Sequence, residues 1–206
     1  FLVHYSEYEP KQPQLDPRFH GGDPQALRNA RPQPAAKTSL IMLSNNPFET
    51  IKYGGSTILG ETPEIYGAEQ LLIERANNKE IVSKLIKQID WWKDYTSINN
   101  SSLDSNPTPG NKKGGLTTIL EKSLGAVAKS GTSTMMDVLD YSEQISSKGF
   151  NFMDTPGFDP VSVTGQVASG ANVICFTTGR GSCFGFKPSP SIKIATNTNM
   201  FNKLEE

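Results

Sequence analysis

The sequence has little cysteine, no long apolar run and no secretion signal. Its 206 residues include only two cysteines, Cys175 and Cys183. Two cysteines are too few for a disulfide framework, and their spacing does not match a zinc ribbon. We therefore expect a reduced, cytoplasmic setting. No apolar run reaches the ~18 residues that a membrane-spanning helix needs, so no membrane association is expected.

An excess of charge of one sign is also missing. Lysine and arginine number 20 against 21 aspartates and glutamates, which gives a formal net charge of -1. No strong field is available to attract nucleic acid or an anionic membrane, and neither is an expected partner. The N-terminus, FLVHYSEYEPKQPQ, lacks the basic start and apolar stretch of a signal peptide. Because the first residue is not methionine, we expect a fragment or a processed product.

Proline and glycine are distributed unevenly, and the chain divides near residue 50. Half of the 14 prolines fall in the first 50 residues, whereas 16 of the 18 glycines follow them. The composition of residues 1–50 predicts a largely irregular segment, with Ser39–Leu43 as its one candidate strand. His20 has no histidine or cysteine nearby and is interpreted as a loop residue rather than a metal ligand.

Residues 51–206 alternate between strand and helix patterns. Strands are predicted at 56–59, 149–153, 173–178 and 191–196; helices are predicted at 63–98 with a break near Asn77, at 119–128, at 161–168 and from 197 or 198 onward. Residues 135–141 fit either a strand or a turn of helix. The alternation predicts an α/β domain with a largely parallel sheet and flanking helices. Of the adjacent Trp91 and Trp92, at least one is expected to pack in the core.

A glycine-rich loop with two lysines is the first candidate site. It comprises Asn111, Lys112, Lys113, Gly114 and Gly115. Glycines permit close backbone approach, lysines supply positive charge, and a helix starting near residue 117 or 118 offers amide donors. Together these features suit a carboxylate or phosphate, although a solvated lysine turn explains the same residues. The loop is not a P-loop, because GxxxxGK[ST] is absent.

A second loop leaves the end of a hydrophobic strand. It comprises Thr178, Gly179, Arg180, Gly181 and Ser182. In open α/β sheets ligands bind at this end of the strands, and an arginine between two glycines can place its planar fork against a carboxylate. A β-turn with an exposed arginine is the alternative. Cys183 is interpreted as either a ligand or a packed thiol, and Cys175 as a core residue.

Three further side chains are candidates for acid–base chemistry. Lys122 and Lys129 lie seven residues apart, so they share one face of the predicted helix. If that face meets the anion loop, one lysine acts as a base or a charge clamp; if it meets water, both are surface lysines. Glu61, just before the predicted helix start at Thr62-Pro63, is a candidate carboxylate base or ligand. A capping or solvated role for Glu61 remains open.

Three segments resemble one family in the order in which they occur. They are GGSTILGETPEIYGAEQLL, NPTPGNKKGGLTTILEKSLGAVAKSGTS and FTTGRGSCFGFKPSPSIKIATNT. These segments resemble the altronate and galactarate dehydratase family, which also includes a sulfolactate branch. The resemblance covers 53–206, whereas residues 1–50 resemble nothing in the family. We expect 51–206 to be a partial α/β catalytic domain.

The resemblance implies a chemistry that composition does not. Members remove water from a polyhydroxy acid by β-elimination and yield a 2-keto-3-deoxy acid, as in hexuronate catabolism. They depend on a divalent metal, typically Fe2+, with Mn2+ as the alternative. The expected catalytic residues are Lys112, Lys122 and Glu61. Both glycine-rich loops are expected to bind the small sugar-acid substrate, which the run VLDYSEQ…TPGFD favours as altronate over galactarate or sulfolactate.

The sequence also departs from the family pattern. Full-length members are longer, and the cysteine and histidine positions that precede the matching region in the family are absent here, so the metal ligands are not identified. Residues 1–50 have the character of a truncated or frame-disrupted reading frame. Two alternatives to an active dehydratase therefore remain: a non-catalytic α/β remnant, and a subunit that needs a partner chain, either as a homo-oligomer or with the missing N-terminal half.

Overall fold

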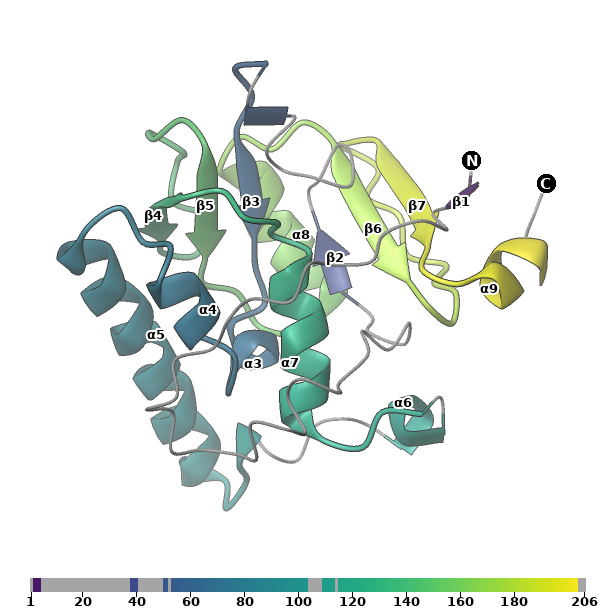
Figure 1. Ribbon diagram of the computed structural model, residues 1–206, viewed down its shortest axis with the longest axis horizontal. Helices are drawn as coiled ribbons and strands as arrows, with labels where there is room; N and C mark the ends of the chain where they lie inside the picture. Colours follow the sequence, from purple (N-terminus) through teal and green to yellow (C-terminus); the bar gives the residue numbers. More distant parts are fainter. Residues whose placement is uncertain are drawn as a thin grey trace.

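The computed structural model describes residues 2–4, 38–40, 50–51, 53–103, 109–113 and 115–203. Strands and helices alternate through these ranges (Figure 1). The strands are β1 (Leu2–His4), β2 (Thr38–Leu40), β3 (Thr57–Leu59), β4 (Met135–Leu139), β5 (Phe150–Met153), β6 (Ile174–Thr178) and β7 (Ser191–Ala195). The helices are α3 (Thr62–Ile65), α4 (Gln70–Ile73), α5 (Lys79–Ile98), α6 (Pro109–Lys113), α7 (Ile119–Ala128), α8 (Asp159–Ala168) and α9 (Thr198–Lys203).

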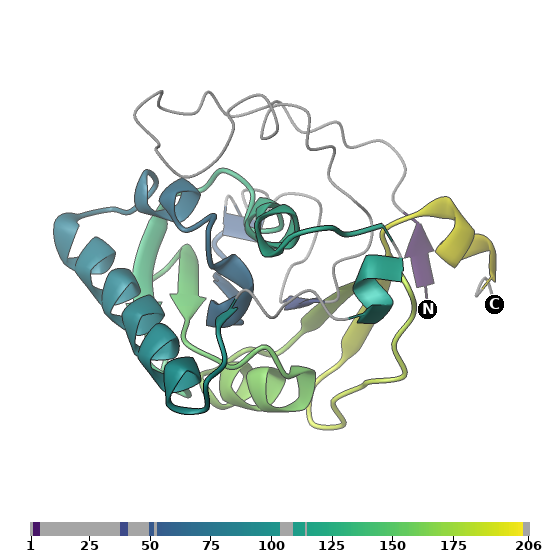
Figure 2. The same cartoon turned by 90° about the horizontal axis from the view of Figure 1, so that it is seen from below.

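The strands form two sheets. One has the order β1-β7-β6-β2 and the other β3-β5-β4. Every described pairing is parallel except that of β2 with β6. In Figure 2 the strands lie between α7 on one side and α8 on the other. The predicted α/β class with a largely parallel sheet and flanking helices is confirmed, although the strands divide between two sheets.

Two short strands come from the segment predicted to be largely irregular. β1 pairs with β7, and β2 pairs with β6. Each has three residues, so neither carries a periodic pattern that sequence reading can detect. β2 overlaps the candidate strand Ser39–Leu43. The remaining calls on residues 1–49, including His20, lie outside the described residues.

The predicted helix 63–98 is interrupted twice. The expected break near Asn77 is present, because Asn78 caps α5 by accepting a hydrogen bond from the Ile81 amide at 3.0 Å. A second break separates α3 from α4 at Gly67, whose φ of 87° is a left-handed conformation suited to glycine. The ambiguous segment 135–141 forms β4. No helix among the described residues is both long and apolar enough to span a bilayer.

The main core lies between the three-stranded sheet and α5. Ile81, Leu85 and Ile89 of α5 recur at helical spacing and are buried, whereas Ile86 is 42% exposed. They pack in one cluster with Leu59, Phe150 and Phe152 from the strands and with Cys175, so the prediction of a core cysteine is confirmed. Burying each large side chain contributes about 1.5–3 kcal/mol.

Parallel pairing fixes where the functional loops can lie. Because β3, β4 and β5 run in the same direction, the chain leaves all three at one edge of the sheet. Glu61, Asp140 and Asp154 follow these three strands, and α3 packs against both α5 and α7 at this edge. In Figure 1 the arrowheads of β5 and β6 point to the same side, so the loop after β6 faces that side as well.

Candidate active site

A buried ion pair joins α3 to α7. Lys122 Nζ lies 2.6 Å from Glu64 Oε1, and the two side chains are 4% and 7% exposed. Pro63 in the first turn of α3 fixes the backbone that carries Glu64. The Lys122 side chain therefore meets α3, which excludes the surface alternative, but the partner is α3 rather than the predicted anion loop.

Glu61 is held in an unusual backbone conformation directly before α3. Its φ of 71° and ψ of 64° are left-handed, and the residue is fully buried. A side chain with a Cβ disfavours this region by about 1–2 kcal/mol, so the surrounding structure must hold the conformation. The Glu61 amide donates to Thr155 Oγ1 at 2.7 Å. Strained residues of this kind cluster at active sites, and Glu61 remains a catalytic candidate.

Lys129 contributes a second buried amine. Its stem is partly exposed, but its Nζ is buried and has no hydrogen-bond partner among the described residues. Burial lowers the pKa of Lys129 from 10.5 to about 8, although the nearby Glu64 and Glu61 carboxylates act in the opposite direction. A fraction of this amine is therefore neutral near pH 8, which is the state that a general base requires.

A polar network that the sequence reading missed supports the Glu61 turn. Thr155 Oγ1 and Ser162 Oγ are 2.8 Å apart, and Gln166 Nε2 donates to Ser162 Oγ at 3.0 Å. The network packs against Gly60, where an added Cβ would lie 2.5 Å from Gln166 Nε2. Gly60, directly before Glu61, is the one sequence feature that could have indicated this network. A side chain at position 60 would push the network away from the backbone.

The two predicted anion loops meet in space. An added Cβ on Gly110 would overlap Nη1 of Arg180, so the guanidinium lies directly against the α6 backbone. Asn111 is 3% exposed, and its Oδ1 is buried without a hydrogen-bond partner among the described residues. Lys112 and Lys113 are exposed on α6. Lys112 is therefore not part of the buried cluster of Glu61, Glu64, Lys122 and Lys129, and Gly114 lies outside the described residues.

The loop after β6 is a hydroxyl-stabilised turn. Thr178 is buried, and its Oγ1 accepts from the amides of Arg180 at 3.4 Å and Gly181 at 3.0 Å. Gly181 adopts a φ of 96°, and Asn197 Nδ2 donates to the Gly179 carbonyl at 3.0 Å. The turn therefore presents Arg180, which is exposed, from a fixed backbone.

Lys193 forms hydrogen bonds with the outer part of the same loop. The sequence analysis did not predict this role. Its Nζ donates to the Ser182 carbonyl at 2.8 Å and to the Phe184 carbonyl. It also lies 4.7 Å from the centre of the Phe176 ring. Partial burial lowers the pKa of Lys193. Cys183, considered as a ligand or a packed thiol, is exposed.

The prediction that the start of α7 offers free amide donors is wrong in part. Thr118 Oγ1 accepts from the Glu121 amide at 3.2 Å, and the Thr117 amide donates to Glu121 Oε2 at 2.9 Å. Of the first donors of the helix, the capping uses the Glu121 amide.

The described residues do not fit the divalent metal that the resemblance implies. Such an ion is held by several oxygen, nitrogen or sulfur ligands. No group of three or more histidine, cysteine, aspartate or glutamate residues comes together in the part of the chain that the structure describes. Glu64, a natural ligand candidate by position, is engaged with Lys122.

Comparison with known proteins identifies relatives of this chain. The family model described as D-galactarate/Altronate dehydratase, C-terminal, matches residues 46–206. Altronate dehydratase of Bacillus subtilis (strain 168) is 42% identical over 151 residues, which cover 73% of this chain and 30% of the relative. The altronate dehydratase of Escherichia coli (strain K12) is 39% identical over 166 residues, 81% of this chain and 33% of the relative.

A third relative extends the range of substrates within the same family. Galactarate dehydratase (L-threo-forming) of Escherichia coli (strain K12) is 39% identical over 153 residues, which cover 74% of this chain and 29% of the relative. The chain thus spans about a third of the length of the relatives that it matches.

Proposed function

This chain belongs to the D-galactarate/altronate dehydratase family, and we propose that it takes part in removing water from a sugar acid. The proposed substrate is altronate, with galactarate or sulfolactate as alternatives. The observation that carries the proposal is the buried cluster of Glu61, Glu64, Lys122 and Lys129. Two carboxylates and two amines in a low-dielectric setting, one amine with a lowered pKa, suit proton transfer.

The proposed reaction is a β-elimination. A base removes the proton from C2 of the acid, the C–H electron pair forms the C2=C3 double bond, and the C3–O bond breaks as the hydroxyl leaves with a proton. The enol that remains converts to the 2-keto-3-deoxy acid. The reaction needs a base for the C2 proton, an acid for the departing oxygen, and positive charge for the carboxylate.

The residues of the chain divide among these tasks. We assign the base to the cluster, with Glu61 and the neutral form of Lys129 as the candidates. Lys122, fixed by Glu64, supplies positive charge or the proton for the leaving group. We assign the substrate carboxylate to Arg180, with Asn111, Lys112 and Lys113 beside it on α6. The divalent metal implied by the resemblance stays a prediction, and its ligands are not among these residues.

A second candidate function follows from the small share of its relatives' length that the chain covers. The chain spans 29–33% of the length of its relatives, which is compatible with one part of an enzyme whose activity needs further polypeptide. In that case we propose a subunit or domain that binds the sugar acid but turns it over only with its partner. A cytoplasmic location and a homo-oligomeric assembly stay predictions.

Turnover of D-altronate by the purified chain, in the presence of Fe2+, tests the proposal. Formation of 2-keto-3-deoxygluconate is followed with a keto-acid reagent, and Lys122→Met is expected to abolish it. If the chain binds altronate without turning it over, and a polypeptide covering the rest of the B. subtilis relative restores turnover, the second function holds. Absence of both binding and turnover under all these conditions would reject both candidates.

Arg180→Ala tests the assignment of the carboxylate site. Loss of a charge-assisted pair should weaken altronate binding by about 1–3 kcal/mol, measured by calorimetry. Lys187→Ala is the matched control, because Lys187 is an exposed cation in the same connection between β6 and β7. Equal affinities of Arg180→Ala and the wild type would remove Arg180 from the site.

A further inference from the structure

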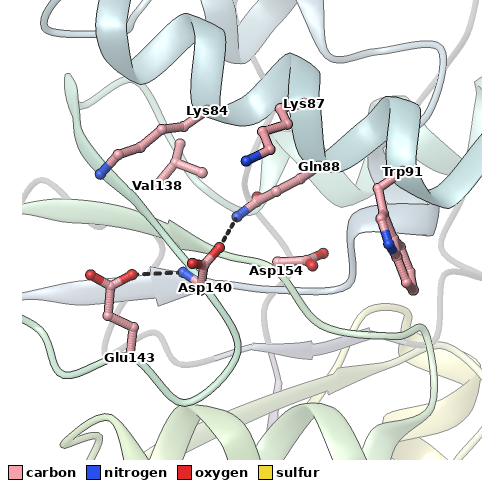
Figure 3. Close-up of a pocket in the computed structure, with 8 residues that line it drawn as sticks. All are labelled: Lys84, Lys87, Gln88, Trp91, Val138, Asp140, Glu143 and Asp154. Carbon is pink, nitrogen blue, oxygen red and sulfur yellow. Dashed lines mark hydrogen bonds between the residues drawn. The ribbon is translucent and has the colours of Figure 1, made fainter.

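A pocket separate from the buried cluster opens beside α5. We call it the α5 pocket; it has a volume of about 440 Å³ and lies between α5 and the carboxyl ends of β4 and β5. Figure 3 shows Lys87, Gln88 and Trp91 reaching from α5 toward Asp140 and Asp154. Neither Arg180 nor any member of the buried cluster is among its lining residues.

Gln88 forms part of the polar wall of the α5 pocket. The residue is 8% exposed, and its Nε2 donates to the Leu139 carbonyl at 3.0 Å and toward Asp140 Oδ1 at 3.5 Å. Its Oε1 is buried and accepts no hydrogen bond from any described residue. Turning the amide over would place Oε1 against two acceptors, so the orientation is fixed by chemistry. Because Oε1 has almost no accessible surface, a ligand in the pocket would not reach it, and Gln88 acts by holding Asp140 in place through Nε2.

The carboxylates add further acceptors. Asp154 Oδ1 accepts from Trp92 Nε1 at 2.8 Å and from Thr62 Oγ1, and Glu143 Oε2 accepts from the Asp140 amide at 2.8 Å. Within the described chain no donor reaches the second oxygen of Asp140 or Asp154. The floor of the pocket is therefore rich in acceptors for the hydroxyl groups of a ligand.

Two lysines and one aromatic ring complete the lining. Lys84 is paired with Asp137 at 3.1 Å, whereas Lys87 forms no ion pair with a described residue. Trp91 is 54% exposed, and its indole stacks on Tyr95 with ring centres 5.0 Å apart and planes 8° apart. Because the Trp91 ring is already held by this stacking, it loses little conformational freedom when a ligand packs on it.

We propose that the α5 pocket binds a polyhydroxylated monocarboxylate, that is, a sugar acid in its anionic form. Hydroxyls donate to Asp140 and Asp154, the carboxylate pairs with Lys87, and the C–H face of the carbon chain packs on Trp91. A polyphosphate would bring several negative charges against the carboxylates of Asp140, Glu143 and Asp154, whereas a monocarboxylate brings a single charge, which Lys87 can pair. This site is additional to the proposed carboxylate site at Arg180, and it does not require turnover.

Binding of D-gluconate to the full chain tests this proposal. The sequence contains two tryptophans, Trp91 and Trp92, and both belong to this region, so intrinsic fluorescence reports on the pocket directly. Gluconate is expected to change the fluorescence saturably. Sorbitol, which lacks the carboxylate, and hexanoate, which lacks the hydroxyls, are expected to bind about tenfold more weakly or worse.

Matched variants identify the location of binding. Trp91→Ala, followed through Trp92, should weaken gluconate binding about tenfold or more, whereas Ile98→Ala, which removes another exposed side chain of α5, should not. Lys87→Met should weaken gluconate but not sorbitol, and Lys79→Met at the exposed start of α5 should change neither. Calorimetry on the same variants provides a readout independent of fluorescence.

Two outcomes would overturn the proposal. One is a wild-type chain that does not bind gluconate at millimolar concentration. The other is binding that survives both Trp91→Ala and Lys87→Met but disappears in Arg180→Ala, since this would assign the ligand to the other site. Retained gluconate binding in Arg180→Ala supports the α5 pocket even if the chain shows no dehydratase turnover, so the two proposals fail separately.

Discussion

Breaking the buried ion pair should cost far more stability than breaking an exposed one of similar length. Lys122→Met removes the ammonium that lies 2.6 Å from Glu64, where both side chains are less than a tenth exposed. Removing one member of a buried ion pair typically costs about 3–5 kcal/mol. The whole fold is stabilised by only about 5–15 kcal/mol, so this single change should remove a large share of the free energy of unfolding.

The chain offers its own control for this experiment. Lys93 pairs with Asp90 at 3.0 Å, but the two side chains are 45% and 59% exposed, so Lys93→Met should cost less than about 1 kcal/mol. The double variant Lys122→Met/Glu64→Leu removes both buried charges and should regain most of the loss. Urea denaturation followed by circular dichroism measures all four proteins. A Lys122→Met cost no greater than that of Lys93→Met, or a double variant less stable than the single one, would refute the reasoning.

Three further predictions follow from the same region. Glu61→Gly should be more stable than Glu61→Ala by about 0.5–1 kcal/mol in urea denaturation, because both remove the carboxylate but only glycine accepts a φ of 71° without strain; equal stabilities would contradict the left-handed conformation. Since the pKa of Lys129 is about 8 in the folded chain against a usual 10.5, the unfolded chain binds more protons between these values, and the free energy of unfolding should rise with pH across them by about 3 kcal/mol. Lys129→Met should lack this rise, and a rise identical to that of the wild type would show that Lys129 is not its source. Chelation with EDTA should leave the melting temperature of the chain unchanged, because no metal-ligand group is found among the described residues; a fall of several degrees would reveal ligands elsewhere in the chain.

Local patterns predicted much of the fold. Helix 119–128 and the strand at 191–196 agree with α7 and β7 to within a residue, because each has a clear period or a clear cap. The division into two sheets was not predictable, since it depends on long-range pairing of three-residue strands. Trp91 and Trp92 illustrate the same limit: one was expected in the core, yet Trp91 is exposed and Trp92 is half-buried, with its indole N–H bonded to Asp154.

The sequence analysis predicted individual residues of the candidate site but not which of them contact each other. The seven-residue spacing of Lys122 and Lys129 indicated a shared face, but not that Glu64 would meet it, because α3 and α7 are separated by more than fifty residues. The contact of Gly110 with Arg180 joins loops about seventy residues apart and brings the two predicted anion loops together. Lys112, ranked beside Lys122 from sequence, is exposed, since a lysine in a loop carries no period that reports which way it points.

Asp154 connects the two regions and constrains how they can influence each other. The same oxygen, Oδ1, accepts hydrogen bonds from the Trp92 indole beside the α5 pocket and from the Thr62 hydroxyl, and Thr62 directly follows the strained Glu61. A ligand hydroxyl that donates to the second oxygen of Asp154 draws on the negative charge of the same carboxylate, so it would weaken the Thr62 contact that holds the start of α3. Coupling between binding sites is reciprocal: any substrate that tightens α3 around Glu61 would in turn alter the affinity of the α5 pocket. Because Thr62 is 1% exposed, water cannot easily replace the weakened hydrogen bond. We therefore expect the Asp154 carboxylate to couple ligand binding in the α5 pocket to the conformation of Glu61.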